Sequence, residues 1–121
     1  MRIGAFLFLL AISCSAATGQ SRGIDGQSAR PWEVKTWSNL PEGKQALEPG
    51  DFAGKVVYVY CFQSWCPGCH SRGFPTLQEL IRRYKGVDDV AFVAIQTAFE
   101  GHHANTPEAA LKTARKYELD I

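Results

Sequence analysis

An apolar run that leads directly into two cysteines stands in the middle of the sequence: Val56-Val57-Tyr58-Val59-Tyr60-Cys61-Phe62-Gln63-Ser64-Trp65-Cys66-Pro67-Gly68-Cys69-His70. Its first seven residues are apolar, and nearly all of them are β-branched or aromatic. A continuous run of this kind, without polar alternation, predicts a strand of a parallel sheet that is covered on both faces. Cys61, inside the run, is then expected to be a small residue of the core.

The flanking residues predict helices and a second strand. Apolar residues recur at spacings of three and four over residues 74–84, which indicates the buried face of a helix. Residues 90–95 are strand-like again, and Thr106 can cap a second helix whose buried face would include Leu111. A short edge strand is expected at residues 32–37. The order of the main elements predicts an α/β fold built on a parallel βαβ unit.

The cysteine motif falls where the first strand ends and the helix begins. Unpaired N–H groups at a helix N-terminus stabilise a thiolate, so Cys66 can have a pKa below the usual value of about 8.5. Cys69 follows one turn later, within reach for a disulfide, and Pro67 and Gly68 form the tight turn between them. We therefore predict a pair that alternates between dithiol and disulfide. His70 is expected to be a solvated residue of the first helical turn.

Two segments resemble the thioredoxin superfamily: Asp51-Phe52-Ala53-Gly54-Lys55-Val56-Val57 and Ser64-Trp65-Cys66-Pro67-Gly68-Cys69. The resemblance is nearest to the exported redoxin branch, the TlpA/ResA-like and AhpC/TSA-like proteins, and covers residues 32–121. It implies a thiol–disulfide oxidoreductase in which Cys66 attacks and Cys69 resolves, with Trp65 as part of the motif. Protein or small thiols would be the substrates, and a thiol protein would donate the electrons. No dissociable cofactor and no metal are expected, because the two cysteines carry the electrons.

The sequence departs from the family pattern where a proton acceptor for the second cysteine is usually found. Tyr60 stands where thioredoxins carry a buried acid, and Arg72 stands where TlpA-like proteins often carry Glu. Glu100, His102 and His103 are therefore considered as substitutes for proton transfer.

The helix after the cysteines and the end of the chain also differ from that pattern. Pro75 is the ninth residue after Cys66, whereas thioredoxins place it eighth, and the extra residue predicts a local bulge in the helix. The family's cis-proline loop, the following hairpin and the last helix would come after Ile121. We therefore expect a thioredoxin-like α/β fold that is truncated after the second core βα unit.

Three other functions remain open for the same motif. The segment from Cys66 to His70 also matches C-x-x-C-H, the attachment site of c-type haem, with His70 as the axial ligand. Cys66 and Cys69 with His70 or one of the two later histidines could bind copper or zinc. The AhpC/TSA resemblance admits a thiol peroxidase, although Gln63 stands where peroxiredoxins have Thr.

The first residues have the layout of a secretory signal peptide: a basic start, an apolar run of about ten residues, and then small residues. Ordinary cleavage would remove residues 1–17, whereas a lipobox-like reading removes residues 1–13 and leaves Cys14 lipidated. Residues 18–31 are predicted to be a flexible leader and residues 32–121 a partial domain. We expect an exported, periplasmic protein that is attached to the membrane only if Cys14 carries a lipid.

Length and charge exclude other classes. A chain of 121 residues allows one domain. Thirteen basic and twelve acidic residues give a net charge of +1, without the basic excess that nucleic-acid binding requires.

Overall fold

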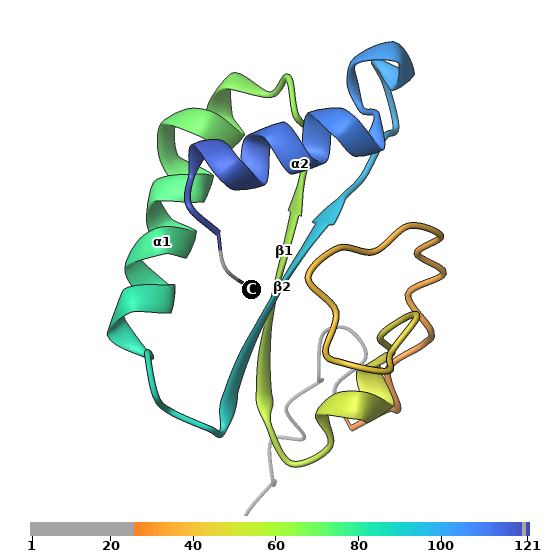
Figure 1. The fold of residues 1–121 in the computed structure, drawn as a ribbon, viewed down its shortest axis with the longest axis vertical. Coiled ribbons are helices and arrows are strands. Elements are labelled where there is room, and N and C mark those ends of the chain that lie inside the picture. Colours follow the sequence, from red (N-terminus) through yellow and green to blue (C-terminus); the bar gives the residue numbers. More distant parts are fainter. Residues whose placement is uncertain (1–25, 120) are drawn as a thin grey trace, which may run out of the picture.

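Two parallel strands and two α-helices form the main elements of the described part of the chain. The computed structural model describes residues 26–119 and 121. Strand β1 (Val56–Phe62) pairs in parallel with β2 (Val90–Gln96), and the register runs from Val56 opposite Val90 to Phe62 opposite Gln96. Helix α1 (Phe74–Arg83) connects the strands, and α2 (Pro107–Lys116) follows β2 (Figure 1). The predicted βαβ unit is confirmed, and β2 extends one residue further than expected.

The core lies between one face of the sheet and the two helices. Phe74 and Leu77 of α1 are fully buried, and Phe62 of β1 and Leu119 after α2 complete the cluster. The rings of Phe62 and Phe74 meet edge to face with their centroids 5.1 Å apart, a favoured aromatic geometry. Because these two residues end β1 and begin α1, their contact fixes the two ends of the cysteine-bearing segment 63–73.

Helix α2 begins as predicted but buries a different side chain. The Thr106 side chain accepts a hydrogen bond from the N–H of Ala109 at 3.2 Å and caps the helix. Thr113 is buried, and its hydroxyl donates to the Ala109 carbonyl at 2.9 Å, which satisfies it inside the protein. Leu111 is 38% exposed, which corrects its predicted place on the buried face. Spacing identifies an apolar stripe, but it does not say which edge of the stripe contacts the sheet.

The second face of β1 is open, contrary to the expectation that the strand is covered on both faces. On the face that carries Val57, Val59 and Cys61, Val59 is 39% exposed and Cys61 is exposed as well. Within residues 26–119, β1 pairs with β2 alone, so its other edge has no neighbouring strand there. The predicted core position of Cys61 is therefore wrong in this structure.

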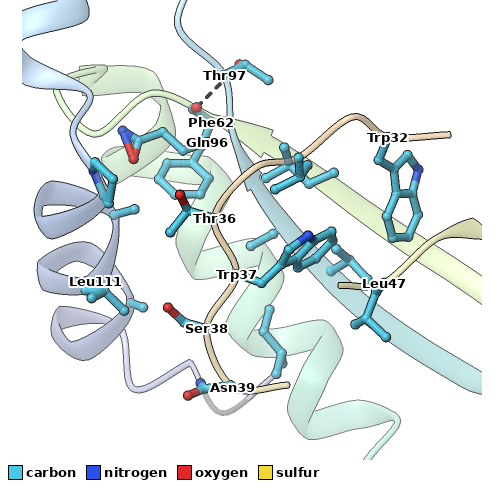
Figure 2. A pocket seen from close by; sticks show the side chains of 18 of the residues that line it. Trp32, Thr36, Trp37, Ser38, Asn39, Leu47, Phe62, Gln96, Thr97 and Leu111 are labelled. Atoms are coloured by element: carbon cyan, nitrogen blue, oxygen red, sulfur yellow. Dashed lines mark hydrogen bonds between the residues drawn. The ribbon is translucent and has the colours of Figure 1, made fainter. Parts of the chain in front are cut away.

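Residues 32–39 run beside β2 and α2 without forming the predicted edge strand (Figure 2). Glu33 has a positive φ of 53°, which interrupts an extended conformation. Trp32 packs against Trp37 and Phe52, with ring centroids 6.0 and 5.7 Å apart. The segment, β2 and α2 line a cavity of about 510 Å³.

The N-terminal predictions lie mostly outside the described residues. These include the signal peptide, the lipidation of Cys14 and the first part of the 18–31 leader. Residues 26–31 contain no helix or strand. In the described part of the chain, no helix is long and apolar enough to cross a membrane.

Candidate active site

A π-helical turn joins the cysteine motif to α1. It spans Cys69–Gly73, and the N–H of Phe74 donates to the Cys69 carbonyl, five residues earlier. A π turn accommodates one additional residue within a helix and is frequent at functional sites. The bulge predicted from the position of Pro75 is therefore confirmed.

Cys66 lies at the start of this helical segment, and its sulfur accepts hydrogen bonds from the next turn. The N–H of Cys69 lies 3.4 Å from the Cys66 Sγ. This bond, followed by one from the Cys69 side chain, lowers the pKa of Cys66 against the opposing effect of burial; the N–H of Gly68 adds to the lowering. A lower pKa raises the fraction of thiolate near neutral pH, and the thiolate is the nucleophilic form.

Cys69 provides the second thiol of the site. Cys66 and Cys69 are both partly buried, and both are free thiols in this structure. Pro67 and Gly68, the two exposed residues between them, are helical in this structure, where the sequence predicted a tight turn. The two sulfurs therefore differ in their contacts, because the sulfur of Cys66 accepts a hydrogen bond from the N–H of Cys69.

Tyr60, near the end of β1, lies against Cys69 from the core side. Its hydroxyl donates to the Cys69 carbonyl over 3.5 Å. Burial raises the pKa of Tyr60 well above its ordinary value, and a hydrogen bond with the Cys69 side chain raises it further. The phenol therefore stays protonated at neutral pH. The sequence identified this position only as one that lacks an acid, and the structure shows that its phenol contacts Cys69.

His70 is an anchored residue and not the solvated one that was expected. Its Nε2 lies 2.7 Å from the Ser64 carbonyl, which only accepts, so Nε2 carries the proton. Its Nδ1 lies 2.9 Å from the Tyr117 hydroxyl, which also lies 3.1 Å from the His70 carbonyl. Both ring nitrogens are thus engaged, and this geometry does not fit an axial haem ligand. In the described residues, no three metal-binding side chains are clustered.

A polar network that the sequence did not reveal holds the segment before Cys66. The N–H of Ser64 donates to Asn105 Oδ1 at 2.8 Å, and Asn105 Nδ2 donates to Gln63 Oε1 at 3.3 Å. The indole of Trp65, which is 42% exposed, donates to the same Gln63 oxygen at 3.1 Å. Gly101 faces this indole closely, because a Cβ there would lie 2.7 Å from Trp65 Nε1. Gln63 is buried, and its side chain is held by this network.

The three residues considered for proton transfer lie on the neighbouring loop. Glu100, His102 and His103 are all exposed. The backbone carbonyl of Glu100 accepts a hydrogen bond from Asn105 Nδ2 at 3.2 Å. In the part of the chain that the structure describes, none of the three makes a hydrogen bond with Cys66 or Cys69.

Comparisons with solved structures found thioredoxin-like neighbours of this chain. A scan against models of protein families found no match, and neither did a search of curated proteins. A crystal structure of a thioredoxin-like superfamily protein matches 77% of this chain with a TM-score of 0.66 and 31% identity. A thiol-disulfide isomerase from Corynebacterium glutamicum matches 64% of this chain with a TM-score of 0.54 and 34% identity. The chain covers 58% and 49% of the lengths of these two proteins.

Proposed function

This chain belongs to the thioredoxin superfamily and has a thioredoxin-like α/β fold, and from this premise we propose that it is a thiol–disulfide oxidoreductase acting through Cys66 and Cys69. The observation that supports the proposal most directly is the hydrogen bond from the Cys69 N–H to the Cys66 sulfur at 3.4 Å. It favours the thiolate at Cys66 and keeps the second thiol one turn away. The name of one structural neighbour, a thiol-disulfide isomerase, agrees with this chemistry.

The proposed reaction has two thiol–disulfide exchanges. The Cys66 thiolate attacks one sulfur of a substrate disulfide, and the other substrate sulfur leaves as a thiolate, which takes up a proton. Cys69 then loses its proton and attacks the Cys66 sulfur, which releases the remaining substrate sulfur as a thiolate. The substrate disulfide is reduced to two thiols, while the cysteine pair is oxidised to a disulfide. The same exchanges run in reverse if the pair is the stronger oxidant.

The substrates, partners and location follow from the resemblance and are part of the proposal. The substrates would be exported proteins or small thiols, and a thiol protein would return the cysteine pair to its starting state. The pair itself carries the two electrons, so no dissociable cofactor is needed. Residues 1–17, or 1–13 with a lipid on Cys14, would direct the protein to the periplasm. Cell fractionation with mass measurement of the mature N-terminus tests this location.

The activity can be tested with insulin as the disulfide substrate and dithiothreitol as the electron donor. We expect the full chain to accelerate insulin reduction above the rate with dithiothreitol alone, and Cys66→Ser to abolish the acceleration. Cys61→Ser is the matched control, because this exposed cysteine lies on β1 before the motif, and it should retain the full rate. Equal rates with and without the protein, or full activity in Cys66→Ser, would refute the proposal.

A further inference from the structure

Tyr60 places a phenol beside the second cysteine, and the reaction described above assigns it no task. We propose, on the basis of the function proposed above, that the Tyr60 hydroxyl donates a hydrogen bond to the sulfur of Cys69 as this sulfur becomes a thiolate. Tyr60 would then determine how fast Cys69 resolves the mixed disulfide, but not how fast Cys66 attacks.

The ring of Tyr60 is fixed so that its hydroxyl points toward the π turn. It stacks on Phe62 with centroids 6.1 Å apart and an angle of 14°, and it meets Phe74 edge-on at 5.2 Å. Phe74 is fully buried and Phe62 nearly so, which leaves the ring little freedom to turn away. The hydroxyl already reaches the backbone of Cys69, at 3.5 Å from its carbonyl oxygen.

Gly73 provides the space that this hydroxyl occupies. A Cβ at Gly73 would collide with the Tyr60 hydroxyl and lie 2.7 Å from Cζ. The backbone of Gly73 is ordinary right-handed helix, with φ −60° and ψ −55°, so no backbone conformation requires glycine here. The absence of a side chain at Gly73 is therefore explained by the tyrosine hydroxyl. This fit supports a specific position for the oxygen as well as for the ring.

A phenol in this position acts as a donor and not as a base. Burial and the neighbouring Cys69 side chain raise the pKa of Tyr60, so the proton remains on the oxygen through the neutral range. A hydroxyl that keeps its proton can donate to a thiolate, and hydrogen bonds to charged groups are stronger than neutral ones. A carboxylate in the same position would instead accept the proton of Cys69.

The step that Tyr60 assists is the second exchange. Cys69 releases its proton to solvent, and the growing negative charge on its sulfur is met by the Tyr60 O–H. The sulfur attacks Cys66, a new bond forms between Cys66 and Cys69, and the bond from Cys66 to the substrate sulfur breaks. The electron pair leaves with the substrate sulfur, which takes a proton from water. Tyr60 is neither oxidised nor deprotonated in this step.

The two exchanges can be separated by stopped-flow mixing of the reduced full chain with a symmetrical nitrobenzoate disulfide, whose thiolate product is coloured. The chain carries Cys14→Ser and Cys61→Ala, so that only Cys66 and Cys69 react. With an equimolar reagent, the first colour release is bimolecular and reports attack by Cys66. The second is unimolecular and reports resolution by Cys69. We expect Tyr60→Phe to slow the second phase about five- to ten-fold and to leave the first phase unchanged.

Tyr58→Phe is the matched control, because Tyr58 lies two residues earlier on the same face of β1 and contacts Phe92 instead of the cysteines. It should leave both phases unchanged. An unaltered second phase in Tyr60→Phe, or equal slowing of both phases, would refute the role of Tyr60 and leave the oxidoreductase proposal intact. Absence of a unimolecular phase in the chain with Tyr60 intact would instead refute the proposed resolution by Cys69, and the role of Tyr60 with it.

Discussion

Replacing Gly73 with alanine should destabilise the protein, although the same change in most helical positions stabilises it. Alanine is favoured over glycine in a helix interior by about 1 kcal/mol. At Gly73, however, the new Cβ collides with the Tyr60 hydroxyl and lies 2.7 Å from Cζ. The ring is held between Phe62 and Phe74, so relief requires a shift of strand or helix, and overpacking of this kind costs about 1–3 kcal/mol. Because the collision is with a ring that is itself held in place, we take the upper part of this range, about 2–3 kcal/mol, and expect a net loss of about 1–2 kcal/mol after the helical gain is subtracted.

Urea unfolding followed by circular dichroism gives the change in free energy from the shift in midpoint at constant slope. Gly68→Ala is the matched control: Gly68 also has right-handed helical angles, and its Cβ would meet only the Cys66 sulfur, at 3.9 Å. This control should be neutral or stabilising. In a Tyr60→Phe background, the free-energy cost of Gly73→Ala should be smaller. The collision with the hydroxyl oxygen is then gone, while the close contact with Cζ remains. A Gly73→Ala chain as stable as its parent would refute the packing argument.

Two further predictions concern Cys66 and the segment before it. The alkylation rate of Cys66 by iodoacetamide should fall to half its maximum at a pH below the value of about 8.5 for a free cysteine. Because the pKa of Cys66 is lower in the folded than in the unfolded chain, the Cys66 thiolate stabilises the fold at pH values above the unfolded-state pKa. This stabilisation is lost as the pH falls through the folded-state pKa. An alkylation midpoint at or above the pH found for free cysteine would contradict a lowered pKa of Cys66. Asn105→Ala leaves the N–H of Ser64 without its 2.8 Å partner and should lower stability by about 1–2 kcal/mol, measured as a shift of the urea midpoint. An unchanged midpoint would show that water replaces Asn105 at no cost.

The sequence predicted the features that depend on neighbouring residues. Continuous apolar residues located β1, and the position of Pro75 relative to Cys66 predicted the π turn, since one extra residue in a helix has to be accommodated locally. Thr106 was identified as the cap because capping depends on a side chain reaching an N–H three residues later.

Features that depend on distant residues were missed or wrong. His70 was expected to be solvated, but its partner Tyr117 is 47 residues away, and no local pattern connects the two. Asn105 was missed for the same reason, since it contacts Ser64 across 41 residues. The prediction that Cys61 lies in the core was wrong because a continuous apolar run does not reveal which face of a strand is covered.

The environment of the two sulfurs consists of dipoles and neutral side chains. The groups that lower the pKa of Cys66 are hydrogen-bond donors from Cys69 and Gly68, and within residues 26–119 no cation adds to this lowering. Tyr60 faces Cys69 as a protonated phenol. Short-range hydrogen bonds inside a folded motif are screened by salt much less than charges at a distance. We therefore attribute the lowered pKa of Cys66 to the conformation of residues 66–69. The contacts of His70 and Asn105 matter because they hold that conformation in place.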